Sequence, residues 1–111
     1  MTEDFDSDFP NLPELEAPLL IIRMVIRIQQ SHSLKEKRKV IRSLKERLRN
    51  RFNLSVAEVG DLEKWQVATL IAVMVNQDRH YLDEQQTKIR QAVEEKLIGE
   101  GDLITYIAEV F

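Results

Sequence analysis

Hydrophobic and polar residues alternate along the first strongly patterned segment of the chain, residues 19–28. Every even position from Leu20 to Ile28 is apolar, whereas the odd positions include Arg23 and Arg27. Successive side chains of a β-strand point to opposite faces. The alternation therefore predicts a strand with one buried face and one partly solvated face.

A helix is expected next, to about Arg51. Its apolar residues recur at helical spacing: Leu34, Ile41, Leu44, Leu48 and Phe52. This spacing places them on one face of an α-helix. Ser33 and Glu36 have the spacing of a capping box, in which the Ser33 side chain caps an amide near Glu36 and Glu36 reaches back to Ser33.

The remaining pattern predicts two strands, a second helix and a last strand. Strands are expected at 53–59 and 66–75, joined by an open hairpin loop. Asp78 is a candidate N-cap for a helix that ends at Gly99, and 103–111 reads as the last strand. The apolar stripe of that helix is Leu82, Ile89, Val93 and Leu97. The order βαββαβ predicts an α+β ferredoxin-like sandwich, with a four-stranded antiparallel sheet and two helices on one face.

Charge divides the chain into two parts. The net charge is -3, but residues 1–18 hold six acidic side chains, no basic one and all three prolines. Residues 19–111 carry the other 13 acidic residues and all 16 basic ones, a net +3. This composition predicts a disordered acidic tail over 1–18 and one domain over 19–111. The tail is expected to be inert, to mask a basic surface, or to dock through its apolar residues: Phe5, Phe9, Leu12 and Leu15.

Composition also excludes several classes of protein. The chain has no cysteine, so it has no disulfide, iron–sulfur cluster or thiol nucleophile. Its apolar runs are far shorter than the roughly 20 residues of a membrane helix, and we expect a cytoplasmic protein without a cofactor. Acylphosphatases share the predicted fold, but they need a glycine-rich loop with an arginine after the first strand. The residues at 29–33 are Gln-Gln-Ser-His-Ser, and the sequence predicts no catalytic activity.

The first predicted helix carries an unusual excess of positive charge. Residues 34–52 include nine basic and two acidic side chains. At about 100° per residue, six basic residues fall on one face: Lys35, Arg38, Lys39, Arg42, Lys45 and Arg49. Such a stripe is typical of a site for a phosphate backbone, although a merely solvated helix face has the same pattern. Lys37 and Arg51 lie near the apolar arc and are expected to snorkel.

The solvated face of the sheet bears on how RNA could bind. Its first strand offers Ile21, Arg23, Val25 and Arg27. The third predicted strand is expected to add Ala68, Leu70, Ala72 and Met74 on the same side. Neither set contains an aromatic residue, which disfavours base stacking on the sheet. An apolar open face favours burial against another subunit, and we expect a homodimer through the sheet face or an edge strand.

Three residues are candidates for isolated roles. Trp65, the single tryptophan, is expected to close one end of the core, with an anchor in a partner interface as the alternative. His32 and His80 lie in separate segments without metal-ligand spacing, so both are expected to be ordinary exposed histidines.

Several segments together resemble the YlxP-like family of small bacterial proteins. They are the residues Ser-Leu-Lys-Glu-Lys-Arg at 33–38, Phe-Asn-Leu-Ser-Val-Ala-Glu-Val at 52–59, Trp-Gln at 65–66 and Asn-Gln-Asp-Arg at 76–79. The resemblance implies a ferredoxin-like fold. It also implies a ribosomal context, because the family's genes often lie beside those for translation initiation factor two and a ribosome-maturation factor.

The expected function is therefore a non-catalytic accessory protein that acts in ribosome maturation or translation. It would bind structured RNA through the basic helix, with ribosomal RNA or the small ribosomal subunit as its partner. The alternative is a homo-oligomeric protein-interaction module with no nucleic-acid role.

Overall fold

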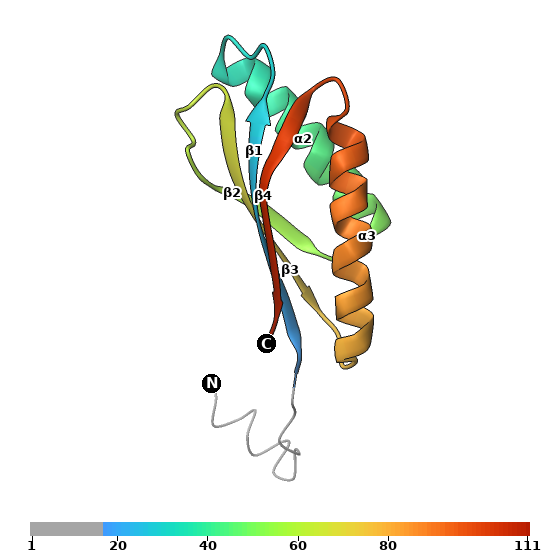
Figure 1. Ribbon diagram of the computed structural model, residues 1–111. Coiled ribbons are helices and arrows are strands. Elements are labelled where there is room, and N and C mark those ends of the chain that lie inside the picture. The colour runs from blue at the N-terminus through green and yellow to red at the C-terminus, as the bar shows by residue number, and fades with distance from the viewer. Residues whose placement is uncertain (1–16) are drawn as a thin grey trace, which may run out of the picture.

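The computed structural model describes residues 17–111, so residues 1–16 of the tail predicted over 1–18 lie outside the described residues. Six elements follow one another: β1 (Leu19–Ile28), α2 (Leu34–Arg51), β2 (Ser55–Gly60), β3 (Val67–Val75), α3 (Arg79–Leu97) and β4 (Gly101–Val110). They confirm the predicted βαββαβ order and the α+β ferredoxin-like arrangement. Figure 1 shows the strands as one twisted layer, with both helices packed on the same side of it.

The sheet is antiparallel, in the order β2-β3-β1-β4. The even residues of β1 lie opposite the even residues of β3, for example Met24 opposite Leu70. Both sets point toward the helices, where β1 buries all five of its even residues. The helices complete this core with their predicted apolar stripes: Ile41, Leu44 and Leu48 from α2, and Leu82, Ile89, Val93 and Leu97 from α3.

This register corrects the prediction for the open face of the sheet. The four residues of β3 that were expected there are buried in the core: Ala68, Leu70, Ala72 and Met74. Their backbone partners are the even residues of β1, so they share the face that the helices cover. The open face of β3 instead carries its odd residues: Val67, Thr69, Ile71, Val73 and Val75. The sequence pattern of β3 is apolar on both faces, so alternation could not decide between them.

Side chains at both helix starts cap the backbone as predicted, with one difference. The Glu36 amide donates to Ser33 Oγ at 3.2 Å, but Glu36 Oε2 accepts from the His32 amide at 2.6 Å rather than from Ser33. The side chain of Asp78 accepts from the amides of His80 and Tyr81. The contacts of the Glu36, His80 and Tyr81 amides satisfy donors that the first helical turn leaves without a partner.

Gly99 makes the turn that leads from α3 into β4. Its φ of +78° lies in the left-handed region, which glycine adopts without strain. Gly101 then opens β4 so close to the Arg27 carbonyl that a Cβ would clash with it. Neither helix in the described part of the chain has the length and hydropathy to cross a bilayer.

Candidate nucleic-acid interface

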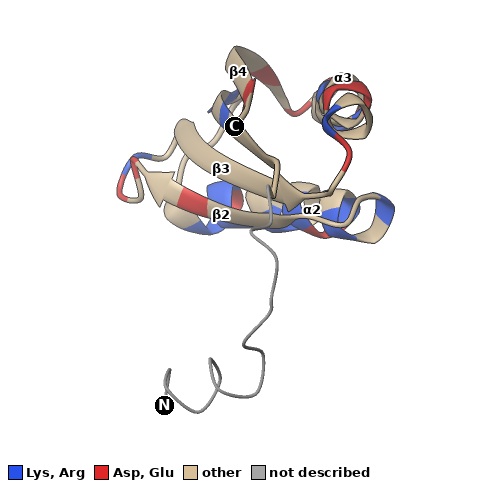
Figure 2. Ribbon diagram, turned by 90° about the horizontal axis from the view of Figure 1, so that it is seen from below, with Lys and Arg blue, Asp and Glu red and all other residues tan. Residues whose placement is uncertain are grey.

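The basic stripe, defined as Lys35, Arg38, Lys39, Arg42, Lys45 and Arg49, lies on the side of α2 that faces away from the core. All of its side chains are exposed except that of Lys45, which is half-buried. The buried residues of α2 occupy the opposite side of the helix and pack on the sheet. Figure 2 shows this concentration of Lys and Arg along α2. The structure therefore places the six predicted residues together on one accessible surface.

Lys37 and Arg51 of α2 have carboxylate partners, whereas Arg47 and the residues of the stripe have none among residues 17–111. Arg51 lies 3.9 Å from Glu95 of α3, with its guanidinium over the Phe52 ring. Within the stripe, Arg49 Nη2 donates to the carbonyl of Val56 at 2.7 Å, which ties α2 to β2. The stripe therefore forms no ion pair within the described part of the chain.

A concavity of about 770 Å³ adjoins the first two turns of α2. Four residues of the stripe line it, together with the capping residues: Lys35, Arg38, Lys39 and Arg42, with Ser33 and Glu36. The Glu36 carboxylate is already engaged by the His32 amide. The basic side chains can therefore direct their ammonium and guanidinium groups toward an anionic ligand on this surface.

Lys37 corrects the prediction that it snorkels to solvent. Its side chain is 1% exposed, and its Nζ lies 2.9 Å from Glu58 Oε2 on β2. The same ammonium donates to the carbonyls of Asp61 and Lys64, at 2.6 Å and 2.8 Å. Lys37 therefore fixes the loop between β2 and β3. Lys37 could not be paired with Glu58 from local pattern, because the two residues lie 21 positions apart in the chain and the register of β2 was unknown.

Trp65 also departs from its predicted place in the core. The residue lies on the loop between β2 and β3, and 52% of it is exposed. In the same loop, Asp61 accepts from Thr69 Oγ1 and lies 3.0 Å from the Lys64 ammonium. These two hydrogen bonds hold the pKa of the Asp61 carboxyl below its usual value. Trp65 is thus an accessible aromatic side chain on a loop whose backbone is held in place.

The open face of the sheet has no aromatic residue on its two central strands, β1 and β3. This holds for the corrected set of β3 residues as it did for the predicted one. Base stacking on the central strands is therefore not available to this chain in the manner of RNA-recognition domains. An RNA ligand would therefore have to contact the basic stripe and the residues beside it.

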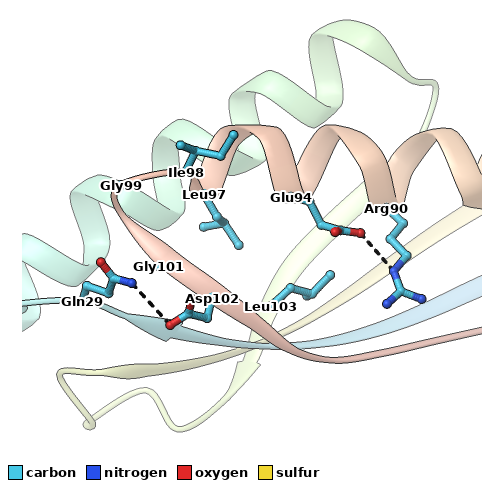
Figure 3. A pocket seen from close by; sticks show the side chains of 9 residues that line it. All are labelled: Gln29, Arg90, Glu94, Leu97, Ile98, Gly99, Gly101, Asp102 and Leu103. Carbon is cyan, nitrogen blue, oxygen red and sulfur yellow. Dashed lines mark hydrogen bonds and ion pairs between the residues drawn. The ribbon is translucent and has the colours of Figure 1, made fainter.

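A separate hollow of about 370 Å³ lies between the end of α3 and the start of β4. Figure 3 shows the side chains that line it. Its polar groups bind each other. Arg90 Nε donates to Glu94 at 3.1 Å, and Gln29 Nε2 donates to Asp102 at 3.4 Å. The hydrogen bond from Arg27 is the main cause of a lowered pKa of the Asp102 carboxyl, and the hydrogen bond from Gln29 adds to it. With its polar groups paired internally, this hollow is a weaker candidate for an anion than the stripe.

The two histidines are exposed and lie apart. His80 Nε2 lies 2.9 Å from the carboxylate of Glu84, one turn further along α3. The His32 amide donates to the carboxylate of Glu36. Within residues 17–111 no group of three or more His, Asp or Glu side chains is placed to hold a metal ion.

Comparisons with known proteins assign the family. Residues 19–104 match the model of the family described as "Protein of unknown function (DUF503)", and the chain belongs to this family. No curated protein matches the chain. Among solved structures, the chain is similar to the de novo designed protein Foldit4, with a TM-score of 0.52 and 11% identity. The match covers 86% of this chain and 97% of the designed one, and it supports the fold alone.

Proposed function

We propose that this protein binds structured RNA through the basic stripe of α2, as a non-catalytic accessory factor in ribosome maturation or translation. The observation that carries the proposal is the set of six basic side chains on one face of α2, none of which has a carboxylate partner among residues 17–111. Lys37 and Arg51 of the same helix are paired with carboxylates, whereas the exposed Arg47 resembles the stripe in having no such partner within the described residues.

The chemistry of the stripe favours phosphate as the group that it recognises. Arginine presents a planar fork that fits phosphate oxygens in pairs, and lysine adds a mobile point charge. The stripe mixes both types over the full length of α2. Contacts of this kind follow the shape of the phosphate backbone and carry no base sequence directly. A folded RNA helix is therefore a better ligand for the stripe than a specific single-stranded sequence.

The ribosomal setting rests on the resemblance of the chain to the YlxP-like family, whose genes often accompany translation genes. Ribosomal RNA, in particular that of the small subunit, offers the dense phosphate surface that the stripe requires. We take the cytoplasm as the site of action for the same reason.

Co-sedimentation with purified small ribosomal subunits, at low and at physiological salt, tests the proposal. The stripe variant carries four substitutions at exposed positions: Lys35→Gln, Arg38→Gln, Lys39→Gln and Arg42→Gln. Arg49 is left intact because its guanidinium holds β2. We expect the wild-type protein to sediment with the subunits in a salt-sensitive manner and the variant to stay in the supernatant.

A matched control separates the place of the charge from its amount. It removes four basic charges outside α2: Lys64→Gln, Arg79→Gln, Lys88→Gln and Lys96→Gln. The two variants have the same net charge, so the control is expected to bind nearly as well as the wild type. Equal loss in both variants, or no binding by the wild type, contradicts the proposal.

A further inference from the structure

We propose that a second copy of this chain docks on the open face of the sheet, so that two copies form a face-to-face homodimer. This inference goes beyond RNA binding and uses the opposite side of the domain. The helices cover one face of the sheet, and nothing within residues 17–111 covers the other (Figure 1).

The open face is largely aliphatic. Its two central strands contribute Ile21 and Val25 from β1 and Ile71 and Val73 from β3. Ile107 of the edge strand β4 is 48% exposed, and Val75 at the end of β3 is 60% exposed. Monomeric proteins seldom leave a continuous apolar surface of this extent in water. Its burial would supply the main driving force for association.

The size of the face reaches the lower level of biological interfaces. The four strands contain 10, 6, 9 and 10 residues. With about 3.3 Å per residue and about 4.8 Å between strands, their flat area is about 550 Å². Two copies packed over this face would bury about 1,100 Å² in total, above the level of about 1,000 Å² that marks a biological interface.

The charges on the face complement a second copy of the same face. Arg23 of β1 and Glu109 of β4 are exposed on it, and neither forms an ion pair within the described part of the chain. Both border a small hollow that is also lined by Ile21, Ile107 and Phe111. In a twofold interface, each contact between a residue of one copy and a residue of the other occurs a second time with the two copies exchanged. Arg23 and Glu109 can therefore pair twice across the dimer.

The edges of the sheet fit this role less well than its face. The pairing of β2 with β3 shifts register between Glu58 and Gly60, and the pairing of β4 with β1 shifts between Val25 and Ile26. Such irregularities twist an edge strand and hinder its pairing with another strand. Of the two dimer interfaces predicted from the sequence, the structure therefore favours the face.

A face-to-face dimer has a consequence for the basic stripe. The helices would form the two outer layers, because they cover the opposite face of each sheet. Each copy would present its own stripe to solvent, on opposite sides of the dimer. Dimerisation and RNA binding would use separate surfaces. A substitution on one surface can therefore abolish one activity and leave the other intact.

Sedimentation equilibrium of the full-length protein at micromolar concentrations tests the proposal. We expect the mass of a dimer for the wild type. Ile107→Glu and Arg23→Glu each place an acidic charge in the interface, and each should raise the dimer dissociation constant by about tenfold or more. Both side chains are exposed in the single copy, so both variants are expected to fold, which circular dichroism checks. Ile98→Glu is the matched control, because Ile98 is 79% exposed just beyond the end of α3, which lies on the other face of the sheet.

The outcomes are separable. Dimers that dissociate in both face variants and persist in the control support the proposal. A monomeric wild type overturns it, including the case in which residues 1–16 of the same chain occupy the face. Dimers that persist in both face variants, or are weakened equally in the control, also overturn it.

Discussion

Lys37 and Glu58 form an ion pair in the interior of the domain, with 2.9 Å between Lys37 Nζ and Glu58 Oε2. The two side chains are 1% and 13% exposed. Apart from Lys37, the buried Glu58 oxygen has no hydrogen-bond partner among the described residues. The pair joins α2 to β2, and the two carbonyls that Lys37 also binds extend the connection to the loop that carries Trp65.

Replacement of Lys37 by methionine should destabilise the protein strongly. Lys37→Met keeps the aliphatic volume but leaves the Glu58 carboxylate buried without its counter-charge, a situation that costs about 3–5 kcal/mol. Urea denaturation at neutral pH measures the loss. The double variant Lys37→Met with Glu58→Leu removes both charges and should recover most of the stability. If the single variant is as stable as the wild type, the ion pair does not have the role assigned to it.

Trp65 should report an exposed environment in the folded protein. Because the residue is 52% exposed, acrylamide should quench its fluorescence efficiently in the native state, with only a modest increase on unfolding. Trp65→Ala should lower the unfolding free energy by about 1 kcal/mol or less, well below the roughly 3–5 kcal/mol of a tryptophan removed from a core. Native fluorescence that resists quenching would contradict this account and indicate that Trp65 is buried in the core.

Acid should weaken the fold partly through Asp61 and Asp102. Hydrogen bonds, chiefly from Lys64 to Asp61 and from Arg27 to Asp102, lower the pKa of each carboxyl from 3.8. A lowered folded-state pKa gives stability that is present above the unfolded-state pKa and is lost as pH falls through the folded-state pKa. The urea midpoint should therefore decline below about pH 4. In the double variant Asp61→Asn with Asp102→Asn this decline should be shallower, and an unchanged decline would exclude both carboxyls as its source.

Tyr106 should resist ionisation in the native protein. Its hydroxyl donates to the Gln86 carbonyl at 2.6 Å, and burial raises the pKa of the phenol, against a smaller opposing effect from Arg90. In the variant Tyr81→Phe, Tyr106 is the single tyrosine, so an ultraviolet pH titration follows it alone. We expect ionisation at higher pH than for free tyrosine. Tyr106→Phe should lower the unfolding free energy by about 1 kcal/mol through the lost hydrogen bond.

Sequence periodicity predicted the fold well because it depends on local patterns. The alternation in β1 and the helical spacing in α2 and α3 each indicate an element without knowledge of its neighbours. The strand β3 shows where this reasoning stops. Both of its faces are apolar, so the assignment of Leu70 to the open face failed, and only the pairing with Met24 decides it.

The candidate site divides in the same way. The basic stripe follows from helical spacing alone, so its six residues could be placed together from the sequence. The environments of Lys37 and Trp65 depend on contacts between α2, β2 and the following loop. Such contacts join residues that are distant in the chain, and no local pattern predicts them.

The salt dependence of RNA binding tests the central claim, that the basic stripe of α2 contacts the phosphate backbone, most directly. Phosphate contacts release counterions, so the logarithm of the binding constant should fall with the logarithm of salt concentration, with a slope of about −0.9 per contact on a duplex. For a structured RNA, fluorescence anisotropy should give a slope of about −5 if all six basic residues make contact. In the variant with Gln at positions 35, 38, 39 and 42, the magnitude of the slope should be smaller by about 3 to 4. The control with four Gln substitutions outside α2 should keep the slope of the wild type. Equal slopes in the wild type and the stripe variant would contradict the claim.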